Sequence, residues 1–322
     1  MKEKAKIVAI VGPTAIGKTS ISIELAKILN GEIVSADSMQ VYRYMDIGTA
    51  KPTLEERQGI PHHLIDIVDP DQDFNVAIYQ QIAKNAIDNI HEKEKLPILV
   101  GGSGLYVNSI VYPLDFTDAK EDHKLRKKLY EVVDKKGNIY LHQKLMEIDP
   151  VTGKKVHPND VKRMVRAMEI YHLTGKPMSE YRQNFENSKI PYEIAMIGLT
   201  MDRKKLYERI NQRVDDMIYK GLVSEVQELL DMGYGKELIS MQGLGYKEII
   251  KYLEGIYTLD EAIDIIKRDT RRFAKRQLTW FRKDKRIYWV DIEKFDNKEA
   301  ITDHLVRHII KKLSLNKLDF AL

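Results

Sequence analysis

Residues 7–19 of the chain read IVAIVGPTAIGKT, an apolar run followed by a complete G-x-x-x-x-G-K-[ST] phosphate-binding loop. The apolar run is typical of a buried β-strand, and residues 20–29 (SISIELAKIL) have the amphipathic pattern of a helix that Asn30-Gly31 ends. A strand, a glycine-rich turn and a helix in this order direct backbone N–H groups and a lysine ammonium at one anion. The sequence therefore predicts a diphosphate site, formed by Gly12, Pro13, Thr14, Ala15, Ile16, Gly17, Lys18 and Thr19.

The composition limits the class of protein. The chain has 322 residues, 43% of them hydrophobic, which is enough to fill the core of one large domain or two ordinary ones. It has no Cys, which excludes disulfides, thiolate zinc sites and cysteine nucleophiles and suits a reducing compartment. No apolar stretch approaches the ~20 residues that a membrane span needs, and the N-terminus lacks a signal-peptide pattern. We therefore expect a cytoplasmic protein with no membrane partner.

Positive charge is concentrated towards the C-terminus. The formal net charge is +4, but residues 267–289 alone hold 10 Lys and Arg against 2 Asp and Glu. The same segment carries Phe273, Trp280 and Phe281 at helical spacing. Such an aromatic stripe is typical of a helix core, and the alternative is a platform for base stacking. The basic residues beside it indicate a polyanionic partner.

The expected elements define a core and an insertion. Apolar runs at residues 7–11, 32–36 and 97–100 alternate with helical patterns at 20–29 and 75–92, which is typical of a parallel sheet with helices on both faces. Polar, basic helices are expected at 121–136, 138–148, 160–173 and 177–186. A strand at 192–199 is then followed by helices at 203–219, 222–231, 245–253, 259–283 and 299–313. We predict a P-loop α/β core of residues 1–114 and 196–322, interrupted by a helical insertion of residues 115–195.

Two polar side chains follow predicted strands of this core. Asp37 comes directly after the second strand, and Ser103 lies in a glycine-rich turn after the 97–100 strand. Ligands of open parallel sheets bind beyond the carboxyl ends of the strands, so we expect both side chains near the phosphate-binding loop. Asp37 there can serve as a general base or a Mg²⁺ ligand, or simply as a helix N-cap. The 97–100 strand lacks the acidic residue that ATPases usually carry at its end, which argues against ordinary ATP hydrolysis.

Two further pairs of residues allow more than one interpretation. Arg209 and Arg213 are four apart on one face of the 203–219 helix, so they fit either the phosphates of a leaving group or an exposed, ion-paired surface. His62 and His63 are adjacent and would point in different directions on an extended chain. Without Cys or an H-E-x-x-H motif, we interpret them as structural residues.

A series of motifs in order along the chain resembles the bacterial tRNA dimethylallyltransferases. The motifs are GPTAIGKT at 12–19, DSMQVY at 37–42, IGTAKP at 47–52, PHHLID at 61–66, VGGSGLY at 100–106, HPND at 157–160, GLVSEV at 221–226, QGLGYKE at 242–248 and AKRQLTWFR at 274–282. Ordered agreement across so many segments is far more specific than a phosphate-binding loop alone.

The resemblance implies a reaction and roles for particular residues. The loop would hold the diphosphate of dimethylallyl diphosphate, with Mg²⁺ as a helper beside Thr19, and the dimethylallyl group would pass to N6 of the adenosine at position 37, next to the tRNA anticodon. By residue match, Asp37 would be the general base, Ser103 would sit at the reaction centre and Arg213 would steady the diphosphate. The family commonly has Thr at the position of Ser103, so the hydroxyl is retained.

The resemblance also implies a tRNA-binding surface for the anticodon stem-loop, to which the insertion of residues 115–195 would contribute. By residue match it would comprise Asp37, Ser38, Met39, Gln40, Ser103, Arg126, Lys162, Arg163, Arg166, Gln242, Gly243, Tyr246, Lys247, Lys275, Arg276, Gln277, Thr279, Trp280 and Arg282. No obligate protein partner is indicated. The alternatives are a small-molecule or nucleotide kinase that uses ATP, and an RNA-binding module without catalysis whose RNA affinity would survive loss of Asp37.

Overall fold

The computed structural model describes residues 4–114, 122–180 and 192–316. The chain forms two compact units, of which the first combines Met1–Val111 with Pro191–Leu322 and the second is Tyr112–Ile190. The predicted insertion ended at residue 195, whereas Glu193, Ile194 and Ala195 already pair with the first strand of the sheet. Of the helix expected at 177–186, residues 181–186 lie outside the described part of the chain.

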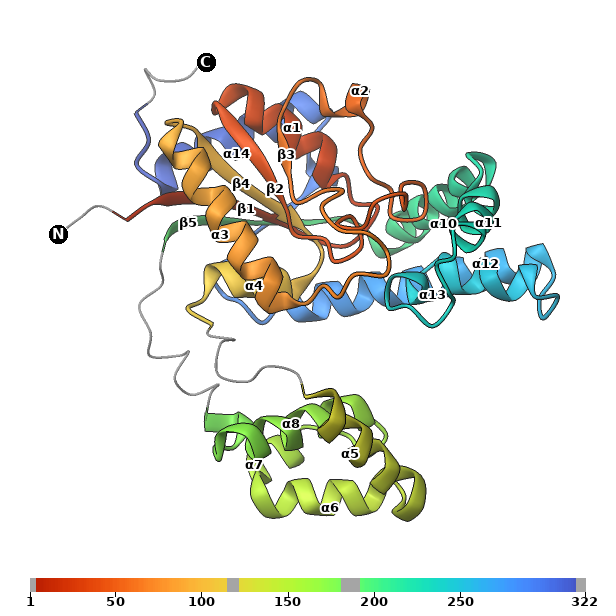
Figure 1. Ribbon diagram of the computed structural model, residues 1–322. Coiled ribbons are helices and arrows are strands. Elements are labelled where there is room, and N and C mark those ends of the chain that lie inside the picture. The colour runs from red at the N-terminus through yellow and green to blue at the C-terminus, as the bar shows by residue number, and fades with distance from the viewer. Residues whose placement is uncertain (1–3, 115–121, 181–191, 317–322) are drawn as a thin grey trace. The chain divides into compact units, whose positions relative to one another are not determined.

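The first unit is built on a parallel sheet of six strands in the order β3-β2-β4-β1-β5-β6 (Figure 1). The strands are β1 (Lys6–Val11), β2 (Gly31–Ser35), β3 (His62–His63), β4 (Leu96–Gly101), β5 (Glu193–Thr200) and β6 (Tyr288–Asp291). All ladders are parallel, which confirms the predicted α/β class. β3 and β6 were not predicted, because strands of two and four residues are too short to show a pattern.

Helices cover the sheet because each presents an apolar stripe to it. α1 (Lys18–Ile28) and α14 (Lys298–Lys312) pack on each other and on the sheet, and α3 (Val76–Glu92) packs with α4 (Gly104–Val111). Asn75 begins α3 by accepting the N–H groups of Ala77 and Ile78. The short α2 (Leu54–Arg57) begins with a capping box formed by Thr53 and Glu56.

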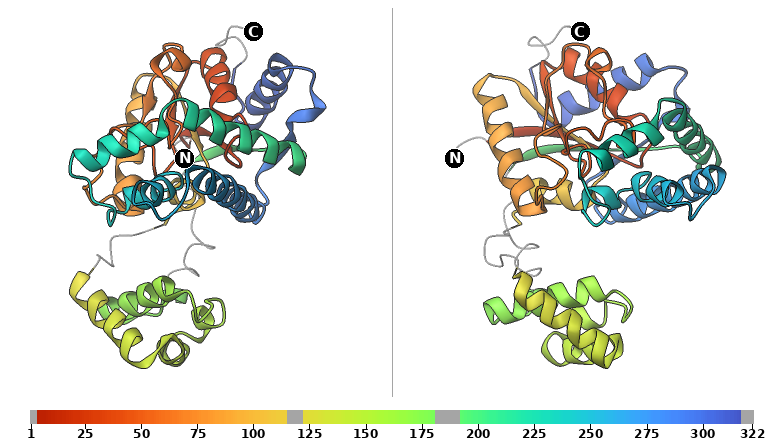
Figure 2. Two further views of the ribbon diagram at one scale, coloured as in Figure 1. Left: turned by 90° about the vertical axis from the view of Figure 1, so that its right-hand side faces the viewer. Right: turned by 45° about the vertical axis from the view of Figure 1, so that its right-hand side comes forward.

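A second group of helices lies beside the carboxyl ends of the strands (Figures 1 and 2). It consists of α10 (Arg203–Tyr219), α11 (Leu222–Asp231), α12 (Tyr246–Leu253) and α13 (Leu259–Phe281). α13 packs against α10 and α12 of its own group and also against α4, the helix that follows β4. None of the helices in the described ranges is both long and apolar enough to cross a membrane.

In the described part of the unit of residues 112–190, the regular elements are all helices. It contains α5 (His123–Lys136), α6 (Asn138–Ile148), α7 (Pro150–Gly153) and α8 (Val161–Thr174). Its own apolar core is formed by side chains such as Leu129, Leu145 and Met164. A separate core explains why the segment forms a compact unit of its own.

Candidate active site

The ends of three neighbouring strands form the site. β2, β4 and β1 are adjacent in the sheet, and each is followed by a segment that the sequence singled out. The phosphate-binding loop follows β1, Asp37 follows β2, and the turn with Ser103 follows β4. The parallel order of these strands therefore brings the loop, Asp37 and the Ser103 turn to one edge of the sheet.

The phosphate-binding loop holds its lysine over its own backbone. Gly17 has a φ of +98°, a left-handed conformation that favours glycine, and it ends the loop where α1 begins. The Lys18 ammonium donates hydrogen bonds to the carbonyl oxygens of Gly12 (3.1 Å) and Pro13 (2.8 Å). Ile16 is buried in the apolar core, which anchors the loop to the sheet. The loop is therefore fixed in shape while Lys18 stays at its centre.

The site contains two cations, Lys18 and Arg213, whose charged forms are disfavoured without a ligand. Burial, together with the nearby charge of Arg213, lowers the pKa of Lys18 to about 8, and the carboxylate of Asp37 partly offsets this effect. Burial likewise lowers the pKa of Arg213, against the opposing effect of Asp37. Arg213 on α10 also donates a hydrogen bond to the Thr14 hydroxyl (3.3 Å). Burial disfavours the charged forms of both side chains, and Arg213 further disfavours that of Lys18, so an anion would stabilise the site.

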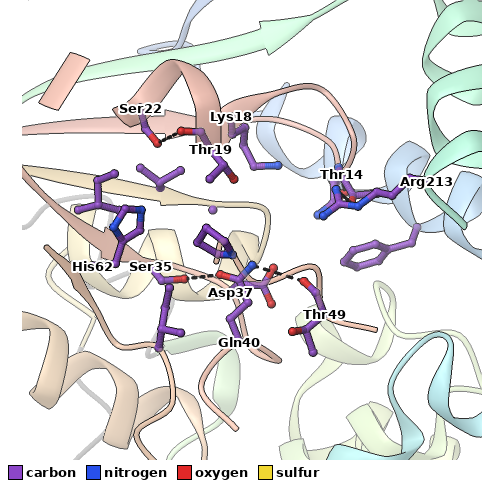
Figure 3. A pocket seen from close by; sticks show the side chains of 17 residues that line it. Thr14, Lys18, Thr19, Ser22, Ser35, Asp37, Gln40, Thr49, His62 and Arg213 are labelled. Atoms are coloured by element: carbon purple, nitrogen blue, oxygen red, sulfur yellow. Dashed lines mark hydrogen bonds between the residues drawn. The ribbon is translucent and has the colours of Figure 1, made fainter. Parts of the chain in front are cut away.

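A small cavity of about 90 Å³ lies between these cations and the segment after β2. Figure 3 shows Lys18 and Thr19 on one side of it, with Asp37 and Gln40 on the opposite side and Arg213 beside Thr14. A second cavity, of about 650 Å³, shares Lys18, Thr19 and Arg213 with the first. The cations therefore line both an inner space and a wider outer one.

Asp37 is held by a local turn. Its Oδ1 accepts the backbone N–H of Met39 (2.9 Å), and its Oδ2 forms no hydrogen bond with any other described residue. One carboxylate oxygen thus fixes the side chain, and the other remains available to accept a proton. This arrangement suits a general base better than a helix N-cap, because no helix begins at Asp37.

Ser103 contacts the Asp37 segment instead of lining the small cavity. Its Oγ accepts the backbone N–H of Ser38 (3.1 Å) and lies 3.3 Å from the Ser38 hydroxyl. Its own N–H donates to the carbonyl of Ala36 (3.2 Å). The structure therefore joins the turn after β4 to the segment after β2 through Ser103.

The cavity is lined by Gln40, which the resemblance assigned to tRNA, and by residues that were not expected from the sequence, such as Ser35, Thr49 and His62. Gln40 accepts the Ser35 hydroxyl (3.1 Å) and donates to the carbonyls of Thr49 and Ala50. His62 also lines the cavity, and burial lowers its pKa, so its ring is neutral near pH 7. The PHHLID motif marked the position of His62, but only the pairing of β3 with β2 brings it to the site.

Comparison with known proteins identifies the family. The family model for IPP transferase matches residues 40–284. The chain is 55% identical to the tRNA dimethylallyltransferase of Acetivibrio thermocellus, over 93% of this chain and 96% of that protein. It is 56% identical to the enzyme of the same name from Carboxydothermus hydrogenoformans, over 94% and 96% of the two chains. The chain belongs to the IPP transferase family.

Solved structures agree with this assignment. The tRNA isopentenylpyrophosphate transferase of Bacillus halodurans is 48% identical, with a TM-score of 0.72 and coverage of 97% of this chain and 99% of that one. A eukaryotic dimethylallyltransferase acting on tRNA is 30% identical, with a TM-score of 0.79 and coverage of 94% and 78%. The fold of this IPP transferase is therefore that of its relatives.

The residues that the family resemblance assigned to tRNA lie in different environments. Exposed side chains include Lys162, Arg163, Gln242, Lys275, Arg276, Thr279, Trp280 and Arg282. Met39, Gly243 and Lys247 are partly buried. The exposed residues of this set on α13, together with Arg282 directly after it, form a basic face. An RNA-binding surface on this face stays a prediction.

Other residues of that set are committed to contacts inside the protein. Tyr246 is fully buried, and its hydroxyl donates to Glu225 (2.6 Å). Gln277 is buried between the phosphate-binding loop and the turn after β4. Arg126 and Arg166 both bind the carboxylate of the fully buried Glu169 in the 112–190 unit. Direct contact of these four with tRNA stays a prediction.

Proposed function

We propose that the small cavity is where this chain, a tRNA dimethylallyltransferase, joins a dimethylallyl group to N6 of adenosine 37. The donor is dimethylallyl diphosphate, and diphosphate is released. The observation that carries the proposal is a cavity lined by Asp37, whose Oδ2 has no hydrogen bond to another described residue, and by Lys18 on the opposite side, with Arg213 beside Thr14. A base on one side of the cavity and an anion site on the other suit the transfer of a dimethylallyl group from diphosphate to a nitrogen.

The reaction breaks one bond and forms another. The N6 lone pair attacks the allylic carbon, the carbon–oxygen bond to the diphosphate breaks, and its electrons leave with the diphosphate. The proton lost from N6 passes to the Asp37 carboxylate. Lys18, Arg213 and the N–H groups of the phosphate-binding loop stabilise the charge that develops on the leaving group. Since Lys18 has a pKa of about 8 without a ligand, a bound diphosphate also favours its charged form.

The loop fits a magnesium ion of the kind that accompanies phosphates. The Thr19 hydroxyl lines the cavity and forms no hydrogen bond with another described residue. No group of three or more His, Cys, Asp or Glu among the described residues could hold a metal by itself. This fits Mg²⁺, which is usually held by few protein ligands together with waters and phosphates. We propose that Thr19 holds Mg²⁺ beside the diphosphate, where the ion would supply further charge for the leaving group.

The basic face of α13 is the proposed contact for the anticodon stem-loop. Lys275, Arg276 and Arg282 are exposed there, and they can neutralise phosphates of the RNA. Adenosine 37 must leave its stack to reach the cavity, which costs a few kcal/mol that such contacts offset. We propose the cytoplasm as the compartment, because the substrate is tRNA.

The test is transfer to unmodified tRNA with Mg²⁺ and either dimethylallyl diphosphate or ATP, followed by nucleoside mass spectrometry. Prenylated adenosine is expected only with the allylic donor, and consumption of ATP with unmodified RNA would favour the kinase alternative. Asp37→Asn keeps the shape of the side chain and should lower the transfer rate by at least about 100-fold. Asp303→Asn, on the exposed surface of α14, is the matched control. Full activity of Asp37→Asn would remove Asp37 as the base.

A further inference from the structure

Gln277 connects two loops of the active site from the middle of α13. Its side chain is only 6% exposed. Its Oε1 accepts the backbone N–H of Thr14 (2.9 Å), and its Nε2 donates to the carbonyl of Gly102 (3.1 Å). Because an N–H can only donate and a carbonyl can only accept, these two partners fix the orientation of the amide.

The turn after β4 is shaped to receive α13. A Cβ at Gly102 would lie 2.1 Å from Gln277 Nε2, and a Cβ at Gly104 would lie 2.2 Å from Trp280 Cδ1. A side chain at either glycine would therefore displace Gln277 or Trp280 from its position against the turn. Ser103 lies between them and binds Ser38, the neighbour of Asp37. A shift of α13 would thus reach both the phosphate-binding loop and the segment that carries the base.

The same helix turns a basic face to the solvent. Lys275 and Arg276 directly precede Gln277 and are exposed, whereas Gln277 points inward. RNA bound along this face would restrict the motion of α13, and the restriction would pass through Gln277 to Thr14 and Gly102. Restricting a loop before its ligand binds increases the affinity for that ligand, because less entropy remains to be lost.

We propose that Gln277 is a positioning residue that couples RNA binding on α13 to diphosphate binding in the loop. The proposal rests on the proposed function, since it takes the α13 face as the RNA contact. Coupling is reciprocal, so RNA should tighten diphosphate binding by the factor with which diphosphate tightens RNA binding. Gln277 acts through Thr14 and Gly102 and need not touch either substrate.

The experiment measures the dissociation constant of pyrophosphate with and without saturating anticodon stem-loop RNA, by titration calorimetry with Mg²⁺. We expect RNA to tighten pyrophosphate binding of the wild-type protein by about 5-fold or more. Gln277→Met, which keeps the length but loses both hydrogen bonds, should reduce this factor to less than about twofold. Gln227→Met is the matched control, because Gln227 is an exposed helical glutamine bonded to Asp231.

A measurement on the wild-type protein keeps the proposal testable if Gln277→Met does not fold. RNA alone should slow deuterium uptake in a peptide spanning residues 12–19. Unchanged uptake, absent coupling in the wild type, or full coupling in Gln277→Met would each overturn the proposal. Failure of the proposed function is distinguishable, because the wild-type protein would then leave tRNA unmodified in the transfer assay.

Discussion

Lys18→Met tests the energetic cost of the anion site. The pKa of Lys18 falls from 10.5 to about 8, mainly because of burial and also because of Arg213. At about 1.4 kcal/mol per pKa unit, the full shift would correspond to about 3 kcal/mol of lost stability at pH 7. The side chain is partly exposed, and its ammonium donates to Gly12 and Pro13, so we expect about 1–2 kcal/mol.

The expected result is a more stable protein that no longer binds diphosphate. Lys18→Met should raise the melting temperature of the ligand-free protein at pH 7 by about 2–8 °C. Pyrophosphate should raise the melting temperature of the wild-type protein but not that of the variant. Lys204→Met, on the exposed surface of α10, is the matched control and should change little.

The pH dependence of the stability difference between Lys18→Met and the wild-type protein gives the sharper test. Between pH 8 and 10.5 the unfolded chain retains the Lys18 proton that the folded protein has lost, so wild-type stability rises with pH in this window. The advantage of Lys18→Met should be complete below pH 8 and should shrink as the pH approaches 10.5. Differential scanning calorimetry from pH 7 to pH 10.5 measures this difference in stability. An equal or lower stability of the variant at every pH would refute the reasoning.

Three further predictions concern other parts of the protein. Replacing Lys275, Arg276 and Arg282 with Ala should weaken RNA binding. The slope of log affinity against log salt concentration should fall by about 0.7 for each phosphate that is no longer neutralised, while pyrophosphate binding without RNA stays unchanged. Glu169→Gln should destabilise the 112–190 unit by about 2–3 kcal/mol, because Arg126 and Arg166 lose a buried carboxylate, and limited proteolysis within that unit measures this. Glu225→Leu should cost about 3 kcal/mol in urea unfolding, since Glu225 accepts three consecutive N–H groups of residues 46–48 and the Tyr246 hydroxyl.

Much of the fold could be predicted from local patterns. The helices expected at 203–219 and 222–231 have those bounds in the structure, because capping residues and apolar periodicity act within a few positions. β3 and β6 were missed because short edge strands depend on a neighbouring strand for their hydrogen bonds. The site followed partly from topology, since Asp37 and the phosphate-binding loop were expected at one edge of the sheet.

The sequence by itself determined the phosphate-binding loop, the α/β class and the family resemblance, because these depend on residues close together in the chain. Only the tertiary structure decided that His62 lines the cavity, that Tyr246 is buried and that Gln277 bridges two loops. Gln277 and Thr14 are 263 positions apart, and no local pattern reports a hydrogen bond over that separation. Such contacts arise where α13 packs against the loops that follow β1 and β4. A polar side chain that is buried there needs hydrogen-bond partners, and only the folded chain supplies them.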